Sequence, residues 1–125
     1  MARGPARAGV TGLMDLLIPP GLSFWQALQR GMVEPIEAPA YLVWVRTLPC
    51  CICGRHGVDA HHIIGGGLKG TGTKTPDFLA MPLCRDEHMA LHRGHVTWEN
   101  AHGLQMEFAA RTMLEAVYRG ELVLR

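Results

Sequence analysis

The feature that most constrains this chain is a set of candidate metal ligands between residues 50 and 92. The set contains, in order, Cys50, Cys53, Asp59, His61, His62, Cys84, His88 and His92. Pairs of thiolate and imidazole donors separated by two or three residues suit tetrahedral zinc, because one tight turn or one helix face brings both donors to the same ion. One zinc ion cannot use so many donors. The set therefore predicts two sites, one structural and one catalytic.

The size and composition of the chain favour one domain with its own hydrophobic core. The chain has 125 residues, of which 48% are hydrophobic. It contains no run of about 18 apolar residues, the length needed to cross a membrane. Pro5, Gly9 and Gly12 interrupt the pattern of a secretory signal. We therefore expect an intracellular, cytoplasmic protein without a membrane partner.

The net charge of +1 gives little indication of nucleic-acid binding, because proteins that hold many phosphates usually carry a clear basic excess. The charge distribution says slightly more, since both lysines, Lys69 and Lys74, lie in the glycine-rich segment 65–74. Such a loop could approach a phosphate backbone closely. It could equally be a solvated surface loop whose glycines only permit tight turns, and both interpretations stay open.

All four cysteines lie between residues 50 and 84, and three of them are Cys50, Cys51 and Cys53. Thiols this close together do not build a disulfide framework, so metal binding explains them better. Cys50 and Cys53, followed by Gly54, have the spacing of a zinc knuckle. Cys51 is predicted to be a small buried residue outside the ligand set.

Prolines and glycines divide the chain into three parts. Residues 1–38 predict a loosely packed N-terminal arm, in which Ser23 can cap a short helix through Gln29. Residues 39–103 predict the metal-binding core, which begins with a short helix at 39–47, although the valines there fit a strand nearly as well. Residues 104–125 predict a helix that ends at Gly120 and packs on the core.

Two predicted elements of this core carry the histidines. Residues 58–64 indicate one strand of a hairpin, on which His61 and His62 point to opposite faces unless a bulge re-aims them. Residues 82–93 indicate a helix ended by Gly94, with positions 84, 88 and 92 near one face. A histidine-bearing helix that faces paired histidines on a strand is the arrangement a one-metal nuclease requires.

The span 39–103 resembles the HNH, or ββα-metal, endonuclease superfamily, and within it the phage recombination-enhancement nucleases and related prophage proteins. The resemblance rests on Cys-Cys-Ile-Cys-Gly at 50–54, Asp-Ala-His-His-Ile-Ile-Gly at 59–65, Gly-Thr-Gly-Thr-Lys-x-x-Asp-Phe at 70–78 and Pro-Leu-Cys-x3-His-x3-His at 82–92. It implies an α+β fold with a small zinc-bound ββα-metal (His-Me finger) core and flanking helices. It also implies a metal-dependent endonuclease that hydrolyses phosphodiester bonds in DNA, in phage recombination or DNA processing.

The same resemblance suggests roles for individual residues. His61 would be a ligand of the catalytic metal, and His62 the general base that activates water. His92, with His88 as a further candidate, would complete the metal site. Many family members orient the base with an asparagine, which is missing between His62 and His88, and Asp77 is the nearest polar candidate.

The resemblance leaves two allocations of the structural zinc open, because Glu87 stands where many relatives have a second cysteine. In the favoured allocation the zinc is held by Cys50, Cys53, Cys84 and His88, which leaves His61 and His92 for the catalytic metal. In the other, His88 and His92 both hold the catalytic metal, and Glu87 or another group completes the zinc site. The first is favoured because thiolate sites accept imidazole more readily than carboxylate.

The implied cofactors are a structural zinc and a catalytic magnesium, manganese or zinc ion. The implied partners are DNA and a recombinase filament, in the cytoplasm of a bacterial host. Candidate contacts to DNA phosphates are Lys69, Lys74, Arg85 and Arg93. A non-catalytic zinc-stabilised module that binds DNA or protein is the alternative. It accounts for the cysteines but needs only four ligands, so it explains the histidine pair less well.

Overall fold

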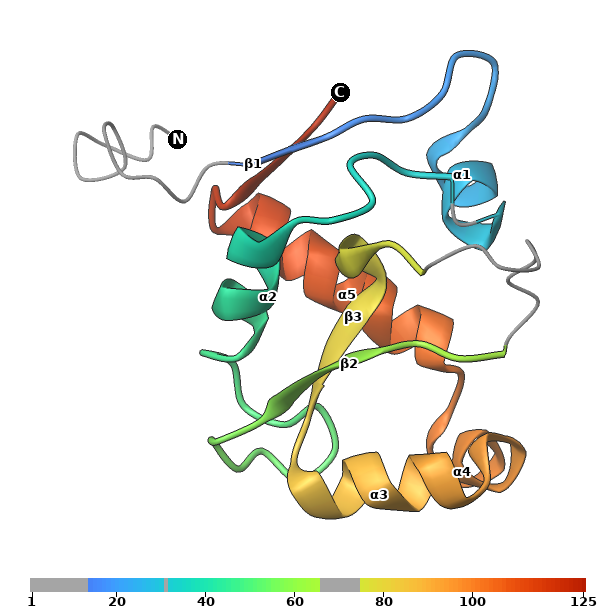
Figure 1. Cartoon of the computed structure of the whole chain (residues 1–125), viewed down its shortest axis with the longest axis vertical. Helices are drawn as coiled ribbons and strands as arrows, with labels where there is room; N and C mark the ends of the chain where they lie inside the picture. The colour runs from blue at the N-terminus through green and yellow to red at the C-terminus, as the bar shows by residue number, and fades with distance from the viewer. Residues whose placement is uncertain (1–13, 31, 66–74) are drawn as a thin grey trace.

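The computed structural model describes residues 14–30, 32–65 and 75–125, and all structural statements concern these ranges. In chain order the elements are β1 (Met14–Leu16), α1 (Phe24–Arg30), α2 (Pro39–Val45), β2 (Asp59–His62), the short 3-10 helix η1 (Asp77–Leu79), β3 (Ala80–Leu83), α3 (Arg85–Arg93), α4 (His95–His102), α5 (Gln105–Tyr118) and β4 (Leu122–Leu124). In these ranges the fold is mixed α+β, with five α-helices and two small sheets (Figure 1). None of the described helices has both the length and the apolar character needed to cross a membrane.

Helix α5 is the central packing element. It contacts β3, η1 and β4, and its Ala109, Met113 and Ala116 are buried. The apolar spacing predicted this helix, and Gly120, at a positive φ of 77°, follows its end as expected. In Figure 1, α3 and α4 lie at one end of the molecule and α1, β1 and β4 at the other, with α5 running between them.

Strands β2 and β3 form an antiparallel pair in which His61 lies opposite Met81. All four residues of β3 are buried, because the strand lies between its neighbours and α5. Pro82 has no N–H to donate, but its carbonyl oxygen accepts a hydrogen bond from the Cys51 N–H at 3.0 Å. This bond ties the cysteine-rich loop, residues 50–54, to the sheet.

The N-terminal region differs from the loosely packed arm predicted for residues 1–38. In its described part Leu16, Leu28 and Val33 are fully buried. Strand β1 pairs in parallel with β4, with Met14 opposite Leu122. The local pattern of prolines could not indicate this pairing, because the partner strand lies at the other end of the chain.

Two short helices agree with the sequence. Helix α1 occupies Phe24–Arg30, and the Ser23 hydroxyl oxygen accepts a hydrogen bond from the Gln26 N–H at 3.1 Å, so the predicted cap is confirmed. Helix α2 begins at Pro39, which confirms the helical interpretation of residues 39–47 over the strand.

The predicted helix over 82–93 begins later than expected. Pro82 belongs to β3, Cys84 occupies the N-cap position of α3, and the helix begins at Arg85. Its end before Gly94 is confirmed. As a result, Cys84 does not share a helix face with His88 and His92.

Two candidate metal centres

The first candidate metal centre is a cluster of three thiols, those of Cys50, Cys53 and Cys84, whose sulfur atoms lie within 4.8 Å of one another. The sulfurs of Cys53 and Cys84 are 3.7 Å apart, and neither residue forms a disulfide. Two thiolates on one tetrahedral zinc lie roughly 3.8 Å apart, because each Zn–S bond is about 2.3 Å long. The three thiols could therefore hold a metal ion such as zinc.

The cysteine-rich loop has the backbone of a knuckle. Gly54 adopts a positive φ of 79°, and its N–H donates to the Cys50 carbonyl oxygen at 2.9 Å. The Ile52 N–H points to the Cys50 sulfur at 3.4 Å. The third thiol, from Cys84, arrives at the N-cap of α3. A shared ion would therefore tie this loop to the start of α3.

Two thiols of the loop, the exposed Cys53 and the half-buried Cys51, differ in pKa. A hydrogen bond from the Arg55 side chain, at 3.4 Å, lowers the pKa of Cys53 to about 7. Burial instead raises the pKa of Cys51 to about 12. Cys53 is thus available as a thiolate near neutral pH, whereas Cys51 remains a thiol and is not among the clustered sulfurs.

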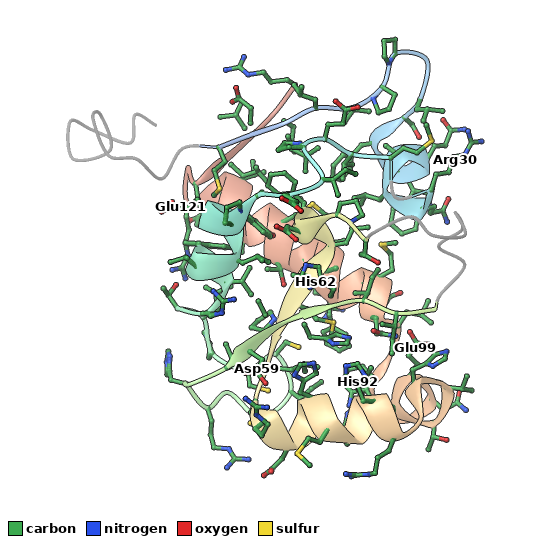
Figure 2. The ribbon with its side chains drawn as sticks, in the orientation of Figure 1. Arg30, Asp59, His62, His92, Glu99 and Glu121 are labelled. Carbon is green, nitrogen blue, oxygen red and sulfur yellow. The ribbon has the colours of Figure 1, made fainter. Side chains whose placement is uncertain are left out.

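The second candidate metal centre is a cluster of three imidazoles, those of His61, His88 and His92. One ring nitrogen of each lies within 4.8 Å of the others, and the ring centroids are 4.9 to 5.3 Å apart. His61 comes from β2, while the four-residue spacing places His88 and His92 on one face of α3. Figure 2 shows His92 between α3 and β2.

Two of these rings are held by other side chains. Nδ1 of His88 lies 2.8 Å from a carboxylate oxygen of Asp59. Because a carboxylate only accepts, Nδ1 carries the hydrogen and Nε2 of His88 is free to bind an ion. Nε2 of His61 lies 2.9 Å from the side-chain oxygen of Gln105. Burial lowers the pKa of His61 to about 4, so its ring is neutral at pH 7.

His62 lies outside the imidazole cluster. It points to the other side of β2 from His92, as Figure 2 shows, in agreement with the alternation predicted for neighbouring strand residues. Its Nε2 atom lies 2.7 Å from a carboxylate oxygen of Asp77. The other oxygen of Asp77 accepts the Ala38 N–H at 2.7 Å. This buried aspartate therefore fixes the His62 ring and leaves Nδ1 as a proton acceptor.

The structure groups His88 with the imidazoles and not with the thiols, which differs from the favoured sequence-based allocation. The carboxylate of Glu87, the other suggested zinc ligand, accepts a hydrogen bond from the Trp98 ring N–H at 3.0 Å and lies 3.6 Å from His102. The physical reason is the late start of α3. Cys84 is its N-cap, so the helix directs His88 toward Asp59 on β2.

The structure describes two of the four candidate phosphate contacts, Arg85 and Arg93. Lys69 and Lys74 lie outside the described residues. The Arg85 side chain is 73% exposed and lies 3.3 Å from Asp59, next to the imidazole cluster. Arg93 is exposed in the last turn of α3. Of the four candidates, Arg85 is therefore one with a described contact to a residue that holds a candidate ligand, because Asp59 also contacts His88.

The sequence alone does not indicate two contacts to the histidines of the candidate site. The ligand pattern includes Asp59 but assigns it no role. Residues two apart on a strand share a face, so the position of Asp59 on the His61 side of β2 follows from the strand period. Gln105 lies 44 residues from His61, and no local pattern links them.

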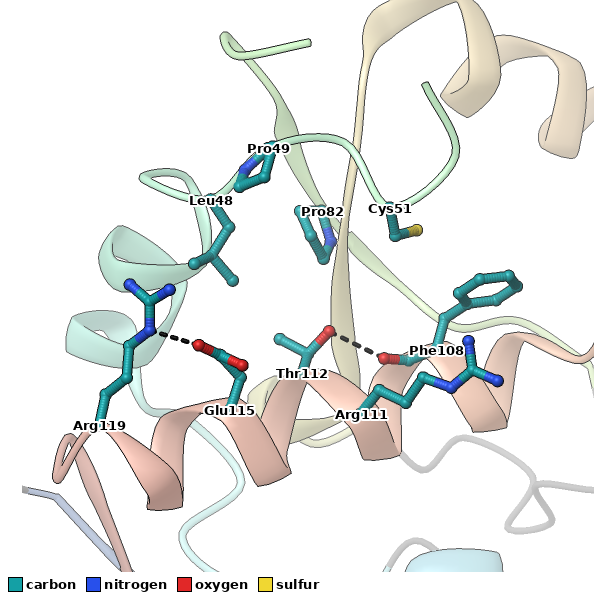
Figure 3. A pocket seen from close by; sticks show the side chains of 9 residues that line it. All are labelled: Leu48, Pro49, Cys51, Pro82, Phe108, Arg111, Thr112, Glu115 and Arg119. Carbon is teal, nitrogen blue, oxygen red and sulfur yellow. Dashed lines mark hydrogen bonds and ion pairs between the residues drawn. The ribbon is translucent and has the colours of Figure 1, made fainter. Parts of the chain in front are cut away.

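A separate groove lies between α5, β3 and the cysteine-rich loop (Figure 3). Its walls are formed by Leu48, Pro49, Cys51, Pro82, Phe108, Arg111, Thr112, Glu115 and Arg119. Glu115 and Arg119 form an ion pair along α5, and the Thr112 hydroxyl donates to the Phe108 carbonyl oxygen at 2.8 Å. The groove contains no member of either metal cluster.

Comparison with known proteins places the chain in a family. Residues 20–120 match DUF968, described as a protein of unknown function, and the chain belongs to this family. It is also similar to a protein of Escherichia coli strain K12 named "Uncharacterized protein YdfU", with 43% identity over 82 residues. The match covers 66% of this chain and 24% of that relative, so the chain spans about a quarter of its length. No solved structure matches the chain.

Proposed function

We propose that this chain is an HNH-type endonuclease that hydrolyses phosphodiester bonds in DNA with the help of a divalent metal ion. One observation carries the proposal. Three imidazoles from β2 and α3 converge, while the adjacent His62 presents a free ring nitrogen because Asp77 holds the other. The order of a strand, an antiparallel strand and a ligand-bearing helix supports a ββα-metal core.

His62 would act as the general base. In hydrolysis a water oxygen attacks phosphorus, loses a proton to Nδ1 of His62, and displaces the 3′ oxygen in line. The ring then carries a positive charge, which the nearby carboxylate of Asp77 stabilises at 2.7 Å. Because Asp77 also accepts the Ala38 N–H, it cannot turn away from the base without losing a buried hydrogen bond.

The imidazole cluster would hold the catalytic metal through His61, His88 and His92. A divalent ion there supplies positive charge for the phosphate and the leaving oxygen. In an in-line displacement the base and the leaving group lie on opposite sides of phosphorus. The position of His62 outside the cluster is therefore compatible with its role. Three neutral nitrogen donors favour zinc or a similar transition ion over magnesium, which prefers oxygen donors.

The thiol cluster would hold a structural zinc ion. Three donors come from Cys50, Cys53 and Cys84, and water or another group would complete the tetrahedron. Because Cys84 directly precedes α3, this ion would fix the start of the helix that carries His88 and His92. The structural zinc would thereby set the distance between the two histidines and β2.

The experiment that tests the function is nicking of supercoiled plasmid with zinc, manganese or magnesium added. The native protein should nick, and His62→Ala should be at least about 100-fold slower, the usual effect of losing a general base. His56→Ala is the matched control, since His56 is exposed and belongs to neither cluster.

Circular dichroism and zinc content should match between the proteins compared. Absence of nicking by the native protein with every metal would instead favour the DNA- or protein-binding zinc module. The resemblance also suggests phage recombination as the setting, so the assay should be repeated on DNA coated with a recombinase filament.

A further inference from the structure

We infer that Gln105 is a positioning residue that selects which ring nitrogen of His61 binds the catalytic metal. The inference rests on the proposed metal site at His61, His88 and His92. It goes beyond that proposal because it assigns a donor atom to His61 and a function to the first residue of α5. The sequence had indicated only a packing helix there.

The Gln105 side chain has a single allowed orientation. Its oxygen accepts from the ring of His61 at 2.9 Å and from the Ile64 N–H at 3.1 Å. Its nitrogen donates to the Ile64 carbonyl oxygen at 2.9 Å and to a carboxylate oxygen of Glu99 at 3.1 Å. A flipped amide would place its nitrogen against the Ile64 N–H and its oxygen against two acceptors. The oxygen must therefore face His61.

This orientation dictates the tautomer of His61. An amide oxygen cannot donate, so Nε2 of His61 carries the ring hydrogen and Nδ1 holds the lone pair. His61 is 1% exposed, so water cannot readily replace Gln105 as the acceptor. A neutral imidazole binds a metal through its lone pair, which makes Nδ1 the donor atom.

The opposite arrangement holds on α3. There the hydrogen of His88 is on Nδ1, held by Asp59, and the lone pair is on Nε2. The cluster therefore combines an Nδ1 donor from β2 with an Nε2 donor from α3. An Nδ1 donor brings the ion closer to its own backbone than an Nε2 donor does, so the choice of nitrogen sets how far the ion lies from β2.

Gln105 also holds the backbone next to this donor. It bonds both the N–H and the carbonyl oxygen of Ile64, two residues after His62, in the manner of a neighbouring strand. Glu99 of α4 holds Gln105 in turn, since its carboxylate accepts the Gln105 backbone N–H at 3.0 Å. Helices α4 and α5 thus position the metal-binding end of β2 through one buried amide.

The test is a zinc titration of the full chain labelled with ¹⁵N-histidine, followed through the ring nitrogens by NMR. Before zinc reaches the imidazoles, His61 should carry its hydrogen on Nε2. During the titration Nδ1 of His61 and Nε2 of His88 should shift. Zinc bound through Nε2 of His61, or a hydrogen on Nδ1, would overturn the inference without any variant.

Two variants of Gln105 separate positioning from simple packing. Gln105→Met keeps the length of the side chain but removes its oxygen, so His61 should populate both tautomers and zinc binding at the imidazoles should weaken about 10- to 100-fold. Gln105→Glu, combined with Glu99→Gln to avoid two facing carboxylates, keeps the acceptor and should retain the Nε2–H form.

Gln29→Met, the same change at an exposed position of α1, is the control and should bind zinc at the imidazoles with an affinity close to that of the native protein. An unchanged tautomer and affinity in Gln105→Met would contradict the positioning role. If the native protein bound no metal at the imidazoles, the proposed function itself would fail. If the native protein bound metal there and Gln105→Met bound it equally well, only the positioning role of Gln105 would fail.

Discussion

Nε2 of His62 lies 2.7 Å from Oδ1 of Asp77, a residue 15 positions later in the chain. This contact joins the end of β2 to the beginning of η1, and through it Asp77 would orient the proposed base. The aspartate is fixed from a third direction, because its own N–H donates to the Ile36 carbonyl oxygen at 2.8 Å. The segment before α2 thereby helps to orient the proposed base.

Replacing Asp77 with asparagine should reduce plasmid nicking by about 100-fold or more. The asparagine oxygen would accept the Ala38 N–H, so its NH₂ group would face His62 and force the hydrogen onto Nδ1. The base would then present the wrong nitrogen to water. Nicking rates at equal zinc content measure the effect. Asp15→Asn, at an exposed ion pair with Arg125, is the control, and an unchanged rate in Asp77→Asn would rule out this orienting role.

Replacing Cys84 with serine should remove one metal ion per chain and lower the melting temperature markedly. Structural zinc contributes folding free energy directly, and this ion would join the cysteine-rich loop to α3. Elemental analysis and thermal unfolding followed by circular dichroism give the two quantities. Cys51→Ser should keep the full metal content, and loss of metal in that variant would show that the ligand set is wrong.

Replacing Asp59 with asparagine should weaken metal binding at the imidazole cluster about 10- to 100-fold, the usual effect of removing a carboxylate that supports a histidine ligand. The carboxylate holds Nδ1 of His88 at 2.8 Å. Competition with a chelator of known affinity measures the change. Asp86→Asn is the matched control, because Asp86 is exposed and lies 3.7 Å from Arg55. Equal affinities in the two variants would argue against the support of His88 by Asp59.

The pH dependence of Cys53 alkylation should report the influence of Arg55. In the metal-free protein the rate with iodoacetamide should rise with pH around a midpoint near the Cys53 pKa of about 7. Arg55→Gln should move that midpoint upward, because the charged donor that favours the thiolate is lost. Mass spectrometry of the modified peptide gives the rate. Arg85→Gln, which leaves Arg55 in place, should not shift the midpoint.

The sequence by itself determined the features that depend on backbone geometry over a few residues. The spacing of Cys50 and Cys53 predicted the knuckle, and the four-residue spacing of His88 and His92 predicted a pair on one helix face. The alternation of a strand predicted that His61 and His62 diverge. Each follows from a fixed turn, helix or strand period, so no distant residue was needed.

Only the tertiary structure decided how these local pairs combine. The start of α3 at Arg85 placed Cys84 with the thiols and His88 with the imidazoles. The packing of α5 against β3 and η1 brought Gln105 to His61 across 44 residues. Such contacts depend on how buried surfaces pack in three dimensions. Because hydrophobic burial is non-directional, the periodicity of one segment does not indicate which other segment it will pack against.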